Sequence, residues 1–194
     1  MGTRSYTQVA RKRSEERTKT SLLDAATRVF FEEDWLGTSL ERIAAEAGVS
    51  KQTLLRHFGS REGLAKAAFE RERTVVVSQR AAAPVGDVGG AVDTLLDHYE
   101  AFGDRALKLE ALPPDAAGAE FVGEGRELHY RWVETVFGPF LGPPSPTRRR
   151  RLAALIAICD VHTWRLLARH LGLGRTEVRA TLMLAINGIL EEAA

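Results

Sequence analysis

The sequence has almost no cysteine, with Cys159 alone among 194 residues. A single thiol excludes an intramolecular disulfide and any metal site built from several thiolates. Cys159 stands in an apolar helical run, so we interpret it as a buried structural thiol rather than a reactive one.

Long apolar runs are also missing. The longest strongly apolar run, residues 153–159, is far too short to span a bilayer, and no apolar stretch follows the charged N-terminus. We therefore expect a soluble, cytoplasmic protein that has no membrane partner.

Motifs of catalysis and metal binding are absent as well. There is no His-Glu-x-x-His or Glu-x-x-His pattern, no glycine-rich phosphate loop, and no order of residues typical of a serine hydrolase. The C-terminal half does hold scattered candidate ligands: His98, His129, His162, His170 and Asp160. Isolated histidines on mixed helix faces are more often packed or solvated than metal-bound. We expect no catalytic residues, no metal and no cofactor.

Excess charge of one sign is missing overall, since the net charge is only +1, but the distribution is uneven. Residues 1–83 carry 15 Lys/Arg and 11 Asp/Glu, whereas residues 84–194 carry 12 and 15. A basic N-terminal part beside a slightly acidic remainder is typical of a protein whose N-terminal domain meets DNA.

What the sequence does contain is a helix-turn-helix pattern at residues 38–58. Thr38 or Ser39 is placed to cap a first helix with an apolar stripe. Gly48 follows where that helix must stop and where the backbone needs a positive φ. Ser50 then caps a second, shorter helix.

The second helix is expected to turn polar and basic groups outward, as a helix entering the major groove requires. An ordinary helical hairpin with a polar surface is the alternative, but caps, glycine, apolar spacing and basic face all agree with DNA binding. We expect Lys51, Gln52 and Thr53 to read bases and His57, Arg61 and Thr38 to contact phosphates. The full set of predicted DNA-binding residues is Thr38, Ser39, Ser50, Lys51, Gln52, Thr53, Arg56, His57 and Arg61.

Helical periodicity covers most of the remaining chain and no strand pattern is visible. The absence of periodicity predicts a flexible basic arm at residues 1–13, either touching DNA phosphates or merely solvated. The proline and glycines of residues 81–90 predict a boundary between a DNA-binding domain at 14–83 and a helical domain at 84–194. We expect one long helix at 148–171 and a last helix from about residue 176.

The final helices carry more apolar faces than one monomer needs, which predicts a two-fold interface with a second copy; both faces being monomer core is the alternative. Aromatic or semi-polar residues also lie on helix faces that should meet inside the C-terminal domain, as in ligand sites. These candidate ligand-binding residues are Tyr99, Phe102, His129, Trp132 and Cys159. For any one of them, a plain core role is the competing interpretation.

The N-terminal third resembles the tetracycline-repressor (TetR) family of bacterial transcription regulators. The resemblance rests on Leu22-Leu-Asp-Ala-Ala with Phe30, on residues 38–50, on Thr53-Leu54 with Arg56-His57-Phe58, and on Ser60-Arg-Glu-Gly-Leu64. Two departures stand out. Leu55 replaces a tyrosine that typically contacts a DNA phosphate, and Arg61 replaces a lysine while keeping its charge.

The resemblance implies an all-α fold, with a three-helix DNA-binding domain followed by a helical domain for ligand binding and dimerisation. It implies a homodimer that binds an inverted-repeat operator in double-stranded DNA, most simply as a repressor released by a small-molecule effector. The competing hypothesis is a helical small-molecule- or metal-binding protein or enzyme, whose helix-turn-helix-like hairpin is not used on DNA. A purely architectural DNA-binding protein is a third hypothesis, which would not need the large second domain.

Overall fold

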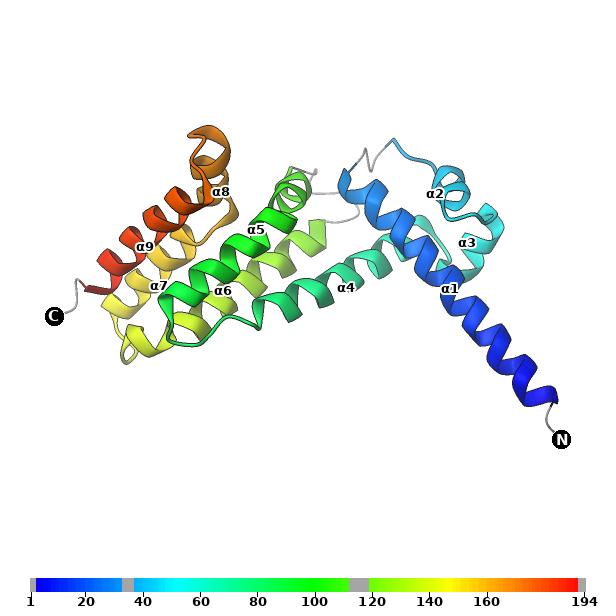
Figure 1. Cartoon of the computed structure of the whole chain (residues 1–194), viewed down its shortest axis with the longest axis horizontal. Coiled ribbons are helices and arrows are strands. Elements are labelled where there is room, and N and C mark those ends of the chain that lie inside the picture. Colours follow the sequence, from blue (N-terminus) through cyan, green and yellow to red (C-terminus); the bar gives the residue numbers. More distant parts are fainter. Residues whose placement is uncertain (1–2, 33–36, 112–118, 192–194) are drawn as a thin grey trace. The chain divides into compact units, whose positions relative to one another are not determined.

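The computed structural model describes residues 3–32, 37–111 and 119–191, and this part of the chain is all-helical without strands (Figure 1). The predicted all-α class is confirmed. The elements follow one another as α1 (Thr3–Glu32), α2 (Leu40–Glu46), α3 (Lys51–Phe58), α4 (Arg61–Arg80), α5 (Val88–Glu110), α6 (Ala119–Leu141), α7 (Pro146–Ile158), α8 (Val161–Arg165), the π-helical turn η1 (Leu166–His170) and α9 (Arg175–Glu191).

The chain divides into two compact units: an N-terminal unit, Met1–Arg73, and a C-terminal unit, Thr74–Ala194. The division lies earlier than the boundary that the sequence predicts after residue 83. It does so because the last turns of α4 belong with the second unit, where the side chain of Arg80 is buried against α5 and α6.

The N-terminal unit packs α1 to α3 and the start of α4 around one apolar core. The predicted inner face of α1 is buried as expected, with Leu22, Ala26 and Val29 fully enclosed. Phe30 stacks on Phe69 of α4, with ring centroids 6.2 Å apart and planes within 11°. This contact fixes α1 against the helix that follows the helix-turn-helix.

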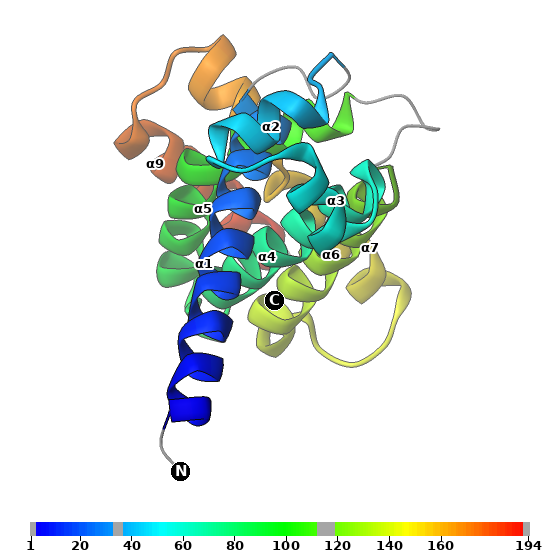
Figure 2. The same cartoon turned by 90° about the vertical axis from the view of Figure 1, so that its right-hand side faces the viewer.

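The predicted flexible arm is instead helical where the structure describes it. α1 begins at Thr3, and in the views of Figures 1 and 2 its first turns project past α2 and α3. Residues 8–17 are all exposed, so no tertiary packing orders them. Residues 3–13 contain no proline or glycine, and extending an existing helix is far easier than nucleating one. Residues 1 and 2 lie outside the described part.

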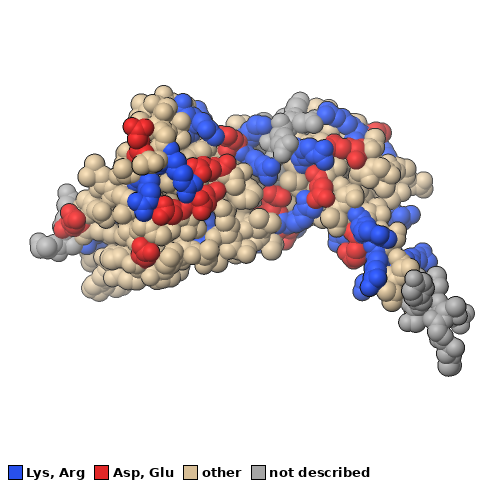
Figure 3. Space-filling model, viewed as in Figure 1, with Lys and Arg blue, Asp and Glu red and all other residues tan. Residues whose placement is uncertain are grey.

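The C-terminal unit has one continuous apolar core, to which α5, α6, α7, α8, η1 and α9 all contribute. Phe137, Leu155 and Ile186 are fully buried at its centre. On its surface, acidic residues of α5 meet basic residues of α9 (Figure 3). Arg179 binds the Asp93 carboxylate through two hydrogen bonds of 2.7 and 3.1 Å, which holds the pKa of Asp93 below its usual range.

The single long helix predicted at 148–171 is wrong. α7 ends at Ile158, and Asp160 has an extended backbone (φ −77°, ψ 153°) with its carboxylate accepting a hydrogen bond of 2.9 Å from the His162 N–H. An aspartate in this role starts a new helix, so α8 begins at Val161. Apolar periodicity continues through the break, which is why the sequence pattern did not reveal it.

Candidate functional site

The turn between α2 and α3 is built as the sequence predicts. Ser39 caps α2 by accepting a hydrogen bond of 3.2 Å from the Arg42 N–H, and Ser50 caps α3 through the Thr53 N–H at the same distance. Gly48 has φ +71°, the left-handed conformation that favours glycine. The two serine hydroxyls therefore fix the helix ends, and their first role is structural.

One side of α3 is buried and the other is open to solvent. Leu54 is fully buried in the N-terminal unit, whereas Lys51, Gln52 and Arg56 are exposed and Thr53 and His57 are half-buried. The exposed groups are donors and acceptors that suit base edges and phosphates. The predicted base-reading residues Lys51, Gln52 and Thr53 thus share the first turn of α3, beside its cap.

Lys51 already has a partner in the free protein. Its Nζ lies 2.7 Å from Oε1 of Glu41, in the first turn of α2. The same hydrogen bond lowers the pKa of the Glu41 carboxyl, which is therefore ionised at neutral pH. DNA phosphates would have to compete with this carboxylate for the Lys51 ammonium.

Thr38 and Arg61 meet away from the open surface. The side chain of Thr38 is only 4% exposed, and its carbonyl accepts a hydrogen bond from Arg61 Nη1. Thr38 is therefore largely covered in the free protein, and its contact with a DNA phosphate stays a prediction. Arg61 is half-buried at the start of α4, where helix N–H groups also favour anions.

Gly63 allows α3 and α4 to approach closely. A Cβ at this position would lie 2.1 Å from the Phe58 carbonyl oxygen, a distance that no side chain tolerates. Two residues of the Ser-Arg-Glu-Gly-Leu segment therefore shape the corner between α3 and α4. Ser60 caps α4 by accepting a hydrogen bond of 3.1 Å from the Gly63 N–H, and Gly63 leaves space for the Phe58 carbonyl.

Residues 22–68, the helices just described, match the family model of bacterial regulatory proteins of the tetR family. This segment, about a quarter of the chain, is thus similar to the corresponding part of tetR-family regulators. Among curated relatives it is 33% identical over 82 residues to the HTH-type transcriptional regulator AlkX of Mycobacterium tuberculosis, covering 42% of this chain and 39% of AlkX. It is 29% identical to the HTH-type transcriptional repressor SCO4008 of Streptomyces coelicolor, covering 64% of this chain and 65% of that protein.

A third relative, the HTH-type transcriptional regulator UidR of Escherichia coli K12, is 31% identical, with 61% of this chain and 62% of UidR covered. The chain thus spans between 39% and 65% of the length of these curated relatives. The matched stretch is 82 residues long for AlkX, 128 for SCO4008 and 122 for UidR.

Solved structures of transcriptional regulators share the fold over nearly the whole chain. A transcriptional regulator from Rhodococcus sp. Rha1 superposes with a TM-score of 0.63 at 20% identity, covering 92% of this chain and 97% of that one. The regulator LfrR of Mycobacterium smegmatis, solved in complex with proflavine, gives 0.53 at 23% identity, covering 88% and 95%. These likenesses establish the two-part helical fold.

Four of the five candidate ligand-binding residues come together inside the C-terminal unit. The Tyr99 hydroxyl donates to the Cys159 carbonyl at 2.7 Å, and the Trp132 indole donates to the Arg80 carbonyl at 3.0 Å. His129 lies between them, with Nδ1 3.1 Å from Arg80 Nη1. Phe102 lies at the edge of this group and is only half-buried; its ring contacts His98, with centroids 5.5 Å apart.

Sequence reasoning missed the centre of this cluster. Arg80 is buried and stands over two aromatic rings, 5.6 Å from the Tyr99 centroid and 5.1 Å from that of Trp132. Its place in the last turn of a helix is where arginines usually cap carbonyls in solvent, so nothing in the pattern marked it. His98, also buried, was considered only as a metal ligand.

Both buried histidines are neutral. Burial, reinforced by the charge of Arg80, lowers the pKa of His98 to about 3 and also lowers that of His129. The Ile156 carbonyl accepts from His129 Nε2 at 3.1 Å, which leaves Nδ1 as the acceptor for Arg80. Burial raises the pKa of the Cys159 thiol to about 12, in agreement with the inert structural thiol expected from the sequence.

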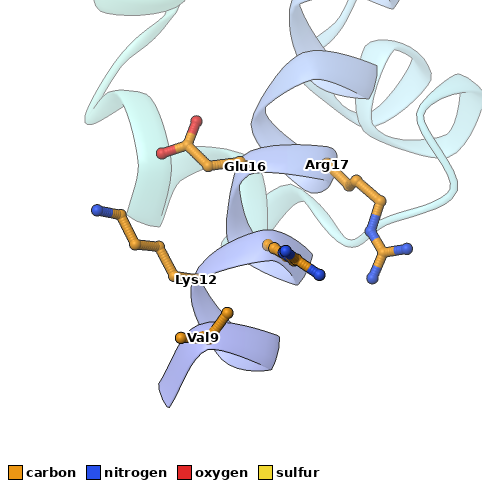
Figure 4. Close-up of a pocket in the computed structure, with 5 residues that line it drawn as sticks. Val9, Lys12, Glu16 and Arg17 are labelled. Atoms are coloured by element: carbon orange, nitrogen blue, oxygen red, sulfur yellow. The ribbon is translucent and has the colours of Figure 1, made fainter. Parts of the chain in front are cut away.

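Outside α3 and the buried cluster, the described residues offer weaker candidates for a binding site. A hollow beside α1 is lined by five residues of that single helix, Val9, Lys12, Arg13, Glu16 and Arg17, and has no second wall (Figure 4). Among residues 3–32, 37–111 and 119–191, no three His, Cys, Asp or Glu side chains gather as metal ligands would. In the same residues, no helix combines the length and apolar character needed to cross a membrane.

Proposed function

We propose that this chain is a DNA-binding transcriptional regulator, a cytoplasmic repressor that leaves its operator when a small-molecule effector binds the C-terminal unit. The observation that carries the proposal is α3. Its Ser50 cap and buried Leu54 fix it in the N-terminal unit, while Lys51, Gln52 and Arg56 stand exposed on one side. Lys51, Gln52 and Thr53 would read base edges, and Arg56, His57 and Arg61 would contact phosphates.

The operator is proposed to be an inverted repeat, because the partner would be a second copy of the chain. Apolar side chains stay exposed on the elements that the sequence singled out for dimerisation: Leu184 on α9 is 77% exposed and Leu171, after η1, 61%. An isologous interface would cover such residues. A two-fold dimer would set the two recognition helices about 34–36 Å apart.

The effector response is proposed to pass along α4. This helix begins at the corner that Gly63 allows and ends at Arg80 in the buried cluster. A ligand that favours one arrangement of the cluster shifts the DNA-competent population only by its differential affinity, commonly about 1–3 kcal/mol. A small change in the spacing of the two heads would then spoil simultaneous binding to both half-sites.

A footprint on the DNA upstream of the chain's own gene tests the proposal directly. We expect protection of an inverted repeat whose halves lie about one helical turn apart, lost when excess salt is added. Protection at random positions would overturn the proposal. So would the absence of any protected site at protein concentrations below those of non-specific DNA binding.

A further inference from the structure

The C-terminal unit buries a positive charge that has no counter-ion among the residues that the structure describes. Arg80 is 8% exposed, and its two hydrogen-bond partners, His129 Nδ1 and the Tyr99 hydroxyl, are neutral. No ion pair joins it to a carboxylate of the residues that the structure describes. A buried guanidinium is costly unless a negative charge compensates it, and an arginine in a protein does not escape the cost by losing its proton.

The unsatisfied part of the guanidinium has a definite shape. Nε is buried and has no hydrogen-bond partner, and Nη2 makes only a long contact of 3.4 Å to the Tyr99 hydroxyl. Nε and Nη2 form one edge of the planar group, and that edge presents two parallel N–H bonds to the two oxygens of a carboxylate. Nη1, on the far side, is held by His129.

The neighbouring titratable groups do not supply the missing charge. His98 and His129 are neutral, and the Tyr99 and Cys159 protons are retained because burial raises both pKa values. Asp160 is near enough for its charge to act on Tyr99, Cys159 and His129, but its carboxylate caps α8 instead of pairing with Arg80.

We propose that the Nε–Nη2 edge of Arg80 is a binding site for the carboxylate of a small organic acid, with the Trp132 and Tyr99 rings against its apolar body. One carboxylate neutralises the single charge of Arg80. A doubly charged phosphate would instead leave an unpaired negative charge among apolar and neutral groups. That this acid is the effector rests on the proposed function; that it binds does not.

Thermal unfolding of the full chain with pairs of compounds that are matched in shape but differ in charge tests the site. Acetate, benzoate and octanoate are compared with acetamide, benzamide and octanamide at constant ionic strength and pH 7.5, with inorganic phosphate as a separate arm. We expect at least one carboxylate to raise the Tm above that of its amide, and phosphate to add nothing beyond its salt effect. No difference within any pair, or stabilisation by phosphate alone, overturns the proposal.

Substitution of Arg80 separates a binding role from a structural one. Arg80→Met keeps the volume and removes the uncompensated charge, so we expect the ligand-free Tm to stay level or rise. The carboxylate response should fall, with a dissociation constant weaker by about tenfold or more. Arg179→Met, which removes a half-buried arginine of the same unit that is paired with Asp93, should leave the response intact.

The outcomes against the proposal are distinct. A large fall in the ligand-free Tm of Arg80→Met would make the guanidinium a structural group. An undiminished response in Arg80→Lys, which keeps the charge but loses the planar fork, would overturn the edge-on geometry. DNA affinity measured with the stabilising carboxylate is a separate readout: binding through Arg80 without a change in DNA affinity keeps the acid site and refutes the proposed release.

Discussion

Lys51 Nζ lies 2.7 Å from Glu41 Oε1, so an ion pair ties the first turn of α3 to the first turn of α2. The pair is exposed and holds a cation at a helix N-terminus, where the helix dipole disfavours it. Glu41 therefore both positions Lys51 and competes with the DNA backbone for it.

Replacing this carboxylate should strengthen DNA binding. In Glu41→Gln, Lys51 is released and one repulsive charge is gone, so we expect affinity for duplex DNA to rise on the order of a few-fold. The salt dependence should steepen by about one unit of log–log slope. Fluorescence anisotropy at several salt concentrations measures both.

Asp24→Asn is the matched control, because it removes a carboxylate paired with Arg71 in the same unit but away from α3. If Asp24→Asn gained as much DNA affinity as Glu41→Gln, the gain would come from the change in net charge and not from the release of Lys51. Weaker binding by Glu41→Gln would contradict a role for Lys51 on DNA.

Gly103 should tolerate no side chain. A Cβ there would lie 2.6 Å from the Trp164 ring, so Gly103→Ala must displace a buried indole and should cost about 1–3 kcal/mol of unfolding free energy. Gly125→Ala, on an exposed position of α6 with nothing within 4 Å, should instead gain about 0.5–1 kcal/mol from helix propensity. Urea unfolding compares them, and equal effects would contradict the packing of α5 on α8.

The buried histidines should make the chain acid-sensitive. Because the folded pKa of His98 is about 3, against 6.5 as the ordinary value, only the unfolded state gains a proton on it as pH falls below 6.5. Its stability contribution is intact above pH 6.5 and is lost progressively down to pH 3, at up to about 1.4 kcal/mol per pH unit. His129, whose pKa is also lowered, adds a loss of the same sign.

Urea unfolding between pH 7.5 and 5 measures this slope. His98→Gln removes one titrating group and should flatten the profile. An unchanged slope in His98→Gln would mean that His98 titrates normally in the folded protein.

The exposed apolar side chains of the last elements should lie in a dimer interface. Leu184→Glu places a charge on a side chain that is 77% exposed in one copy, so the single chain should fold while the dimer dissociates. Sedimentation velocity at micromolar concentration should show the monomer. Val85→Glu, at a 60% exposed apolar residue of the turn before α5, should stay dimeric. A wild-type chain that sediments as a folded monomer would exclude the interface.

The sequence predicted those features that short-range chemistry determines. Ser39, Gly48 and Ser50 act within one helical turn, so their roles were readable from spacing. Features that depend on distant parts of the chain could not be predicted from spacing. Arg80 is buried by groups that follow it by 19 to 52 residues, and the burial of Thr38 depends on tertiary packing. The break at Asp160 was missed because one capping carboxylate outweighs an otherwise uninterrupted apolar period.

Selection of duplexes from a random pool tests the central claim most directly, that α3 reads DNA sequence through Gln52 and its neighbours. Wild-type protein should enrich an inverted repeat. Gln52→Ala should bind that repeat about 1–3 kcal/mol more weakly and lose preference at one base pair of each half, whereas Arg61→Ala should weaken all sequences alike. No enriched sequence for the wild type, or identical preferences and affinities for all three proteins, would contradict the account.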